Sequence, residues 1–528
     1  MSTVIPNSTI EFFGDVGLSP TYEDSRYFTD TVTKDTFFDN LPKARVLTCT
    51  YQRENRNRVR VGLRMASLYN KQYMRFKNAN AGFFENKWYY AFITAVDYVN
   101  NETTEVEYQI DYVMTWMGEF NLSKCYVERQ HSTTDAIGDN IVEENLEIGD
   151  YVHNWIRRTG QLNQTYQIII GASVDQQGTS GAGGELINNV YSGVYLHRFG
   201  TVAAANQFID SLTGKAQDPA IVGAVMFPSG FAPVEGGGTT TAYIVHIPKQ
   251  YPGVTGGGGI DGYSPRNKKL FTYPFNFLNV TNGDGNFATL RYEFFNTPSS
   301  EGVNDCLFSL YAQPTLQPEC ILEPMYYKTH DGQIFNTAEK MSLKGFPQCS
   351  FNIDQYKAFL AQNSSSLAAD AIATVGSGII STGANVLSGN FGGALQSALG
   401  AGERIMMRAA KMNDYARKPP QANGTTTGDI EAGRKLKDFY FYSSSITYDY
   451  AKIIDDYFDM FGYAQNRLMY PNMAARPSWT YVKTSGCIVH CNAPSEDVRE
   501  IEAAFDRGIR FWQSGVAIGD YNASNTVS

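Results

Sequence analysis

The sequence contains few residue patterns of the kind that carry out catalysis. The segment Gly178–Ala182 (GTSGA) begins like the G-x-S-x-G turn that holds a nucleophilic serine, but it lacks the final glycine. It also lies in a glycine-rich stretch and does not follow a buried strand, so we interpret it as a linker. Neither H-E-x-x-H nor G-x-x-x-x-G-K-[ST] occurs. We therefore predict a protein that is not an enzyme, without catalytic residues or cofactors.

Two cysteines and a histidine near the C-terminus have a spacing that could hold a metal ion. Cys487, His490 and Cys491 lie within five residues, and such side chains are common zinc ligands. The run GCIVHC has strand character, however, and alternation along a strand places Cys487 and Cys491 on one face and His490 on the other. The sequence therefore favours cysteines that pack in a core, and we predict no metal site.

Three acidic residues in a predicted hairpin could act on a charged partner. The run 88–99 is rich in aromatic and β-branched residues, the residues NNETT form a turn, and the run 106–112 alternates apolar and polar side chains. This pattern predicts a long hairpin with one solvated face, on which Glu105, Glu107 and Asp111 lie together. A strand with a basic face precedes the hairpin, and cross-strand pairing with its Arg58 or Arg60 is an alternative role for these acids.

Other elements follow from local patterns. We predict helices over 202–212 and 495–507 and a tight turn in the TNGDGN stretch at 281–286. In the last helix one face is apolar and Gly508 follows at the position where helices commonly end. The stretch SLYNKQYMRFKNA (67–79) breaks strand alternation and is interpreted as holding a short helix. The helix at the C-terminus presents Val498, Ile501, Ala504 and Phe505 on its apolar face.

Composition limits the class of protein. A chain of 528 residues is long enough for two to four domains. Its 43 basic and 53 acidic residues give a net charge of -10, which argues against tight binding of nucleic acid. Aromatic residues make up 13% and glycines number 48, as in strand-rich proteins with many turns. Seven scattered cysteines and a start without a secretory signal predict synthesis in the cytoplasm with reduced thiols.

One segment differs from the rest of the chain because it carries no charge over 32 residues, 371–402. As a helix it would be about 48 Å long, enough to cross a bilayer. Only nine of its residues are Ile, Val, Leu or Phe, so a solitary membrane helix is disfavoured. A basic flank suited to anionic headgroups follows from Arg404 to Lys418. The nine apolar residues are Ile372, Val375, Ile379, Ile380, Val386, Leu387, Phe391, Leu395 and Leu399.

Small residues in this segment favour association of several copies. They recur at every fourth position and would line one face of a helix, which lets backbones approach closely in lipid. Several copies could then turn their polar sides inward and their apolar sides to the bilayer. A disordered linker or a packed loop is the alternative for a segment of this composition. The small residues are Gly389, Gly393, Ser397 and Ala401.

The two ends of the chain resemble the tail-knob, or distal tail tube, proteins of small short-tailed bacteriophages. The resemblance covers roughly the first 130 residues and 70 near the end, and the middle third has no comparable match. It depends on the order and spacing of several runs together with the position of the uncharged segment. These runs are SRYFTDTVTKDTFF (25–38), 51–79, 86–117, YFDMFGYAQNRLM (457–469) and 476–514.

The resemblance implies a β-rich α+β fold and a homo-hexameric, open-ended knob. Both chain ends would build a β-sheet tube domain, the middle a mixed and mainly β outer knob domain, and a long hydrophobic loop would plug the tube until infection. It implies a location in the virion at the tail tip after assembly in the cytoplasm of the bacterial host. The expected parts are tube 1–165, knob 166–350, membrane-active loop 351–429, return segment of the knob 430–470 and tube 471–528.

The resemblance also implies partners. These are other tail proteins of the upper tube or collar, the host cell membrane, and double-stranded DNA that passes without being tightly bound. On a tube wall, Glu105, Glu107 and Asp111 would repel the DNA phosphates. A tail-associated cell-wall glycan hydrolase, a pore-forming toxin and a receptor-binding adhesin are the alternatives. Long glycine-rich loops in the middle region would suit a host surface receptor as a further partner.

Overall fold

The chain forms a β-rich structure with few helices in the part that is described. The computed structural model describes residues 8–49, 57–78, 86–162, 165–172, 181–183, 186–187, 190–191, 195–214, 221–231, 242–313, 319–328, 340–350, 426–427 and 437–527. Two compact units are present. The first comprises residues 1–149, 263–272 and 447–528, and the second comprises residues 150–262 and 273–446.

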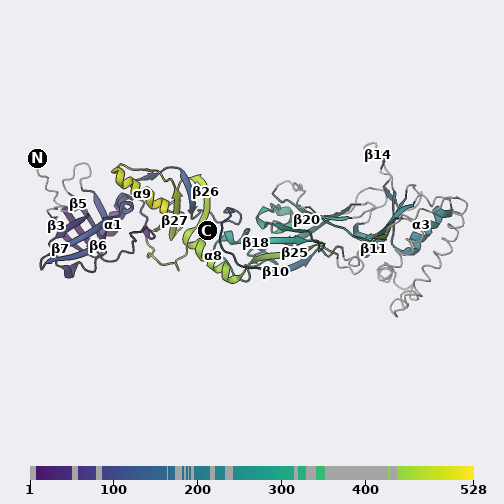
Figure 1. Ribbon diagram of the computed structural model, residues 1–528, viewed down its shortest axis with the longest axis horizontal. Coiled ribbons are helices and arrows are strands. Elements are labelled where there is room, and N and C mark those ends of the chain that lie inside the picture. The colour runs from purple at the N-terminus through teal and green to yellow at the C-terminus, as the bar shows by residue number, and fades with distance from the viewer. Residues whose placement is uncertain are drawn as a thin grey trace. The chain divides into compact units, whose positions relative to one another are not determined.

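The first unit contains a six-stranded antiparallel sheet, sheet A, with the strand order β3-β1-β5-β6-β7-β4 (Figure 1). Two helices accompany it, α1 (Thr31–Asp39) and α2 (Tyr112–Trp116). Asp30 begins α1, because its carboxylate accepts a hydrogen bond from the Thr33 N–H at 2.7 Å. The strands are β1 (Ser8–Phe13), β3 (Lys43–Cys49), β4 (Arg58–Val61), β5 (Tyr73–Asn78), β6 (Trp88–Asn100) and β7 (Thr103–Ile110).

Both faces of sheet A are buried where the strands are central. Alternation along β1 sends Ile10 and Phe12 into one hydrophobic cluster and Phe13 into another, which includes Phe38 of α1. The predicted hairpin is confirmed as β6 and β7. The short helix expected in 67–79 is wrong for residues 73–78, which form β5 between β1 and β6. Because both faces of β5 are covered, its buried residues do not alternate with polar ones, and the strand pattern is hidden.

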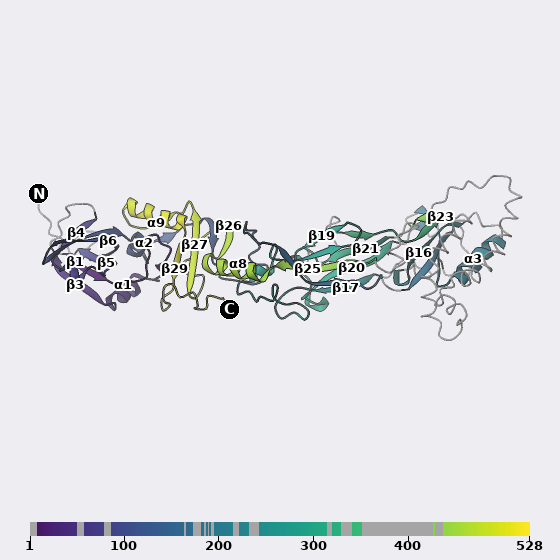
Figure 2. The same cartoon turned by 60° about the horizontal axis from the view of Figure 1, so that its bottom comes forward.

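A second sheet of the first unit, sheet B, combines strands from distant parts of the sequence in the order β2-β29-β27-β9-β26. Helix α9 (Ser495–Arg507) lies beside β27, as Figure 2 shows, and buries Ile501, Ala504 and Phe505. The predicted last helix is thus confirmed. The strands are β2 (Ser25–Arg26), β9 (Cys125–Gln130), β26 (Tyr463–Met469), β27 (Trp479–Ser485) and β29 (Ile509–Trp512), with helix α8 (Tyr448–Phe461) next to β26 in the sequence.

Glycine ends α9 for a steric reason. Gly508 has φ +100°, and a Cβ at this position would lie 2.1 Å from the Tyr481 hydroxyl oxygen. Only glycine satisfies both the backbone conformation and the close approach of the tyrosine. The chain then turns directly into β29, whose four residues are all buried.

The second unit is built from three larger sheets around one hydrophobic cluster. Sheet C has the order β10-β25-β18-β19, and the TNGDGN turn connects its strands β18 and β19, as predicted. Sheet D has the order β17-β20-β21-β22, and sheet E has the order β12-β15-β11-β16-β23-β24. The predicted helix over 202–212 is present as α3 (Val202–Gly214).

The strands of the second unit have the following bounds. Sheet C consists of β10 (Tyr151–Arg158), β25 (Tyr440–Ile446), β18 (Asn276–Thr281) and β19 (Phe287–Leu290). Sheet D consists of β17 (Tyr243–Pro248), β20 (Asp305–Gln313), β21 (Glu319–Met325) and β22 (Met341–Leu343). Sheet E consists of β12 (Gly181–Gly183), β15 (Tyr195–Phe199), β11 (Tyr166–Ala172), β16 (Ile221–Pro228), β23 (Gln348–Ser350) and β24 (Thr426–Thr427). A two-stranded ladder pairs β13 (Leu186–Ile187) with β14 (Val190–Tyr191), and β8 (Asn121–Leu122) pairs with β28 (Val489–His490) in the first unit.

The boundaries of the units differ from those expected from the sequence. Residues 447–470, expected in the return segment of the knob, belong to the first unit because β26 pairs with β9. Residues 150–165 belong to the second unit because β10 pairs with β25. The short segment 263–272 also belongs to the first unit, although its neighbours on both sides belong to the second.

Candidate functional site: charged strands and a buried polar network in the first unit

Opposite charges face each other across β4 and β7. The register places Arg58 opposite Glu107 and Arg60 opposite Glu105. Arg58 forms ion pairs with Glu107 at 2.8 Å and with Glu105 at 3.2 Å, and Arg60 pairs with Glu105 at 2.7 Å. The hydrogen bond from Arg60 holds the pKa of the Glu105 carboxyl below its usual value. The cross-strand pairing considered as an alternative for these acids is therefore present.

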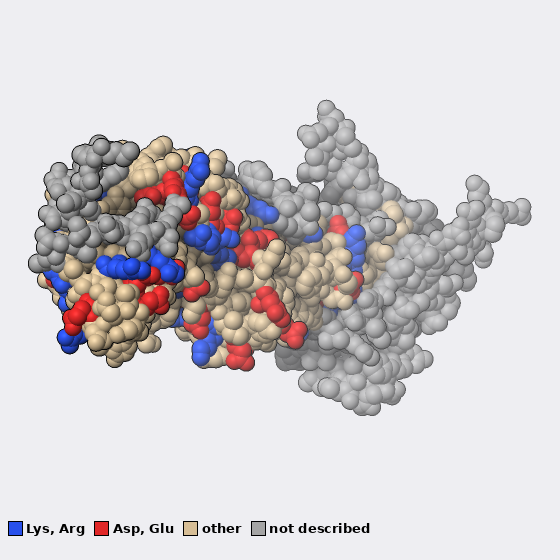
Figure 3. All heavy atoms as spheres, turned by 60° about the vertical axis from the view of Figure 1, so that its left-hand side comes forward, with Lys and Arg blue, Asp and Glu red and all other residues tan. Residues whose placement is uncertain are grey.

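A further acid on this face is Asp97, which the sequence analysis did not select. Asp97 is exposed and lies directly opposite Glu105 in the register of β6 and β7. Directly opposed carboxylates repel each other, and the two arginines of β4 offset this repulsion for Glu105. The length of the turn indicates this pairing, because a turn at 101–102 places Asp97 of β6 opposite Glu105 of β7. Figure 3 shows basic and acidic side chains close together on one face of the chain.

Asp111 does not lie on the exposed face, and the expectation that it joins Glu105 and Glu107 is wrong. It is 1% exposed and begins helix α2, where its carboxylate accepts hydrogen bonds from the Met114 N–H and the Tyr73 hydroxyl, each at 2.9 Å. Burial raises the pKa of Asp111 to about 6. The strand ends at Ile110, so the alternation that would have placed Asp111 outward stops one residue before it.

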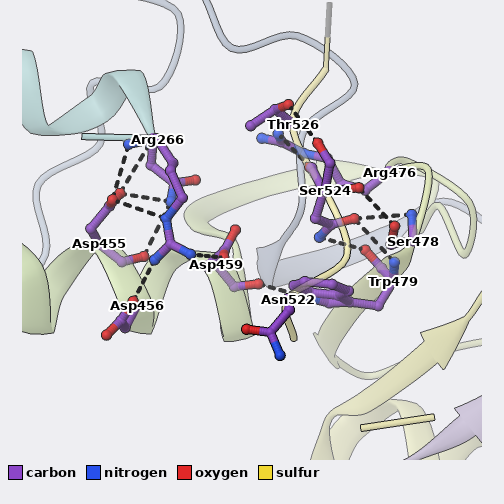
Figure 4. Close-up of polar contacts among 12 residues, drawn as sticks. Arg266, Asp455, Asp456, Asp459, Arg476, Ser478, Trp479, Asn522, Ser524 and Thr526 are labelled. Carbon is purple, nitrogen blue, oxygen red and sulfur yellow. Dashed lines mark hydrogen bonds and ion pairs between the residues drawn. The ribbon is translucent and has the colours of Figure 1, made fainter. Parts of the chain in front are cut away.

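A buried carboxylate in α8 holds the segment 263–272 in place (Figure 4). Asp455 is fully buried, and its two oxygens accept hydrogen bonds from the backbone N–H groups of Arg266 at 2.9 Å and Asn267 at 3.0 Å. The Tyr263 hydroxyl donates at 2.8 Å and the Asn267 side chain at 2.9 Å. Every lone-pair direction of this carboxylate is therefore used to fix residues almost 190 positions away in the sequence.

Arg266 connects Asp455 with two further acids of α8. Its guanidinium contacts Asp455 at 3.3 Å and Asp459 at 2.9 Å, and it also pairs with Asp456 (Figure 4). Burial raises the pKa of Asp459 to about 6, although Arg266 acts in the opposite direction. Three carboxylates within five consecutive residues of α8 thus share one arginine from the segment 263–272.

The same segment contributes a second buried ion pair. The Lys269 ammonium donates to the Val142 carbonyl oxygen at 2.7 Å and pairs with Glu144, which also pairs with Arg129. Burial lowers the pKa of Lys269. Asp135 accepts a hydrogen bond from the Tyr463 hydroxyl at 2.6 Å. These contacts join the segments 129–144, 263–272 and 447–463 by polar interactions.

His131 lies beneath this network in its neutral form. Its Nδ1 accepts a hydrogen bond from the Tyr481 N–H at 2.8 Å, so the proton is on Nε2, which donates to the Asp459 carbonyl oxygen at 3.0 Å. Burial, together with the positive charge of Arg476, lowers its pKa to about 3. His131 therefore serves as a fixed hydrogen-bonding group at neutral pH and does not titrate near it.

Residues near the C-terminus form hydrogen bonds with the beginning of β27 in sheet B. The Asn525 amide oxygen accepts hydrogen bonds from the Ser478 N–H at 3.1 Å and the Trp479 N–H at 3.0 Å, and its amide nitrogen donates to the Trp479 carbonyl oxygen at 3.0 Å. The Ser478 hydroxyl donates to the Ser524 carbonyl oxygen at 2.7 Å (Figure 4). The Asn525 side chain thus makes hydrogen bonds with the backbone of Ser478 and Trp479 that a neighbouring strand would otherwise make.

The cysteine and histidine pattern near the C-terminus does not form one cluster. Cys487 is buried beside Cys125 in the hydrophobic core, which raises its pKa to about 12, and Cys491 packs against the same core. His490 is exposed and its Nε2 lies 2.6 Å from the Ser123 hydroxyl. Within the described ranges, no three His, Cys, Asp or Glu side chains are arranged to hold a metal ion.

Several predicted residues lie outside the described residues. These include the residues 178–180 and the whole uncharged segment, with its apolar residues from Ile372 to Leu399 and its small residues from Gly389 to Ala401. The helices that the structure describes include none with the length and apolar character needed to cross a bilayer.

Residues 238–526, more than half of the chain, match the family described as "Bacillus phage phi29, Tail knob protein gp9, C-terminal domain". The chain belongs to this tail knob family. The resemblance stated from the sequence is thereby confirmed, and the chain is a structural component of a phage tail and of the virion. Residues 6–121, which include sheet A, match the family described as "Caudoviral major tail protein N-terminus".

Tail knob proteins of Bacillus phages correspond to the chain along its whole length. Tail knob protein gp9 of Bacillus phage B103 is 25% identical, and that of Bacillus phage phi29 is 24% identical, each over 99% of this chain and 99% of the relative. The fold is similar to the solved structure of the bacteriophage C1 tail knob protein, gp12. The TM-score is 0.61 at 15% sequence identity, and the match covers 98% of this chain and 99% of that chain.

The sequence of this tail knob chain does not predict the polar network between Asp455 and the segment 263–272. Asp455 sits between Ile454 and Phe458 on the buried face of an amphipathic helix, where the pattern alone does not distinguish a buried acid from a solvated one. Its partners lie in a segment without regular secondary structure apart from one 3-10 turn, Lys268–Phe271. Only the folded structure brings the two together.

Proposed function

We propose that the chain assembles into a homo-hexamer at the distal end of the phage tail and that this ring conducts DNA during ejection. The observation that carries the proposal is the correspondence of the whole chain with proteins named tail knob proteins. The first unit forms the tube and the second unit the outer knob. The neighbouring partners are the proteins of the upper tail tube or collar, and the DNA passes without tight binding.

The charged strands of sheet A support a role at the wall of this tube. Asp97, Glu105 and Glu107 carry three negative charges and Arg58 and Arg60 two positive ones, so these five residues together carry one net negative charge. A surface of this kind offers no cluster of free cations that would release counterions from DNA. A weakly negative wall lets the duplex slide, because contacts with phosphates are short-lived.

The segment 351–429 plugs the tube before infection and helps to penetrate the host cell membrane afterwards. Its 32 uncharged residues, with small side chains at every fourth position, support this part of the proposal. Six copies would share their polar sides and present their apolar sides to lipid. The basic residues from Arg404 onward would hold the segment at anionic headgroups.

Electron microscopy of the purified protein tests the assembly. We expect six-fold rings or short tubes in negative stain, with a mass of six chains by native mass spectrometry. A monomer at micromolar concentration would refute the ring.

Phage particles with altered charges test the role of the wall. The variant D97N/E105Q/E107Q removes three acids of the face, and we expect slower DNA ejection because free arginines then hold the phosphates. Glu102→Gln is the matched control, because Glu102 pairs with Arg64 at the hairpin turn. Equal ejection rates for all particles would contradict a position of this face at the lumen.

Vesicles test the membrane part. We expect the knob to release dye from vesicles of phosphatidylglycerol and phosphatidylethanolamine after loop release. The variant I379N/L387N should lose this activity, whereas S381N/S388N, which changes nearby polar residues, should keep it. Equal leakage for both variants, or none for the wild type in any released state, would refute the loop's membrane role.

A further inference from the structure

The outer face of sheet C in the second unit has the composition of a ligand-binding surface. Along β18, Leu278 and Val280 point into the hydrophobic core, and on β25 Phe441 does the same. Alternation therefore turns Asn279 and Tyr442 to the opposite face. This outer face carries aromatic, hydroxyl, amide, imidazole and guanidinium groups, and we call it the sheet C face.

The register defines the sheet C face as a grid across four strands. Three rows cross the sheet, each with side chains from neighbouring strands. The span across four strands is about 14 Å, the length of a short oligosaccharide. The rows are His153, Ser444 and Phe277; Ile156, Tyr442, Asn279 and Thr289; and Arg158, Tyr440, Thr281 and Phe287. Ser444, Phe277 and Asn279 are buried, so the other eight positions form the accessible part of the face.

A chain of hydrogen bonds runs across this face and fixes its polar groups. The Asn279 amide nitrogen donates to the Ser444 hydroxyl at 3.0 Å, and the Thr289 hydroxyl donates to the Asn279 amide oxygen at 3.0 Å. At the other end, His153 Nδ1 lies 3.1 Å from the Ser444 hydroxyl. The two ends of the chain, Thr289 and His153, are exposed. Their remaining hydrogen-bonding capacity is therefore held in fixed positions for a ligand.

Apolar side chains on the same face are open to solvent. Phe287 is 62% exposed and Ile156 is 59% exposed, while Tyr440 and Tyr442 are half-buried. The Tyr442 ring lies 5.2 Å from the His153 ring. An exposed surface that combines rings with hydrogen-bonding groups is typical of an interaction site, because rings give contact area at low entropic cost.

We propose that the sheet C face binds a saccharide chain. The faces of sugar rings present C–H groups that pack on aromatic rings, while their hydroxyl groups require donors and acceptors at the edges of the same rings. The accessible part of the sheet C face offers both, with the rings of Phe287, Tyr440 and Tyr442 and the polar groups of His153, Thr289 and Arg158. None of the grid positions carries a carboxylate, and Arg158 is exposed at one edge, so an acidic sugar is favoured over a neutral one.

The same composition argues against a second copy of the chain as the occupant. The buried centre of a protein–protein contact is depleted in charged groups and is continuous in its apolar area. Here polar and apolar side chains are mixed within the rows: Arg158, Tyr440, Thr281 and Phe287 alternate in one row, and Ile156 and Tyr442 lie beside Asn279 and Thr289 in another. A saccharide matches this mixture because its own apolar C–H faces and its hydroxyl groups lie a few ångströms apart. The inference does not depend on the hexameric ring.

Titration of the purified full-length protein with defined oligosaccharides tests the inference. The probes are neutral N-acetylglucosamine oligomers and acidic galacturonate oligomers, measured by isothermal calorimetry and saturation-transfer NMR. We expect the acidic oligomers to bind. Phe287→Ala and Tyr442→Ala should each weaken binding at least tenfold, and Arg158→Gln should weaken the acidic oligomers more than the neutral ones.

The control lies on sheet D of the same unit. Ile244 in β17 is 50% exposed, and Ile244→Ala removes a comparable apolar side chain away from the sheet C face. It should leave binding unchanged, and all variants should unfold at the wild-type temperature to within a few degrees. Tyr442→Phe keeps the ring and should retain most of the affinity. The inference is overturned by three results: no probe binds at millimolar concentration, the sheet C variants bind like the control, or the sheet C face is protected from hydrogen exchange by a second copy.

Discussion

Replacing Asp455 tests whether the buried carboxylate holds the segment 263–272. In Asp455→Ala, two backbone N–H groups and the Tyr263 hydroxyl lose their acceptor, the Asn267 side chain keeps only the carbonyl oxygen of residue 455, and Arg266 loses a buried partner. Breaking a buried pair in this way costs about 3–5 kcal/mol. For a domain of this size each kcal/mol lowers Tm by about 2–4 °C, so the first unit should unfold at a clearly lower temperature.

Asp456 provides a matched control one residue away. It pairs with the same arginine, but its side chain is 49% exposed. Asp456→Ala removes the same charge and should cost no more than about 1 kcal/mol. Differential scanning calorimetry gives the two changes in Tm. Hydrogen exchange followed by mass spectrometry measures the protection of the Arg266 and Asn267 amides, which only Asp455→Ala should remove. Equal Tm and equal amide protection in the two variants would refute the argument.

Three further predictions concern the first unit. The pKa of Asp111 is raised to about 6, so the ionised carboxyl destabilises the fold, and this destabilisation appears as pH rises through 6. Asp111→Asn keeps the helix cap without the charge. The Tm of this variant relative to that of the wild type should therefore be higher at pH 7.5 than at pH 4. Gly508→Ala should lower stability by about 2–4 kcal/mol in urea unfolding, while Gly486→Ala, with positive φ and open space around it, should cost only about 1 kcal/mol. Asn525→Ala should cost about 1–3 kcal/mol and expose the start of β27 to hydrogen exchange, and the exposed Asn522→Ala should change neither.

The parts of the fold that the sequence predicts are those that local patterns determine. The hairpin of β6 and β7 alternates because one of its faces is solvated, and α9 shows an apolar stripe and a terminal glycine. In each case a few consecutive residues contain the whole pattern. The TNGDGN turn between β18 and β19 is of the same kind.

The parts that the sequence does not predict depend on contacts between distant residues. Strand β5 does not alternate because sheet A buries both of its faces. The spacing of Asp111 from Glu105 and Glu107 matches the polar positions of β7. The strand ends before Asp111, however, and the residue begins α2, where its side chain is buried. For Asp97, the position in sheet A follows from the hairpin, but its importance appears only when the arginines of β4 are placed beside it.

The choice of a carboxylate at Asp455 has a structural consequence that an apolar contact would not provide. A hydrophobic side chain stabilises a neighbouring segment without fixing its register, because dispersion contacts change little when the segment slides. Asp455 instead accepts hydrogen bonds from the side chains of Tyr263, Arg266 and Asn267 in addition to two backbone N–H groups, and a shift of one residue would move these side chains away from the buried carboxylate. The chain passes from the second unit to the first before residue 263 and returns to the second unit after residue 272. The buried acid therefore contributes to the specificity of the fold as well as to its stability.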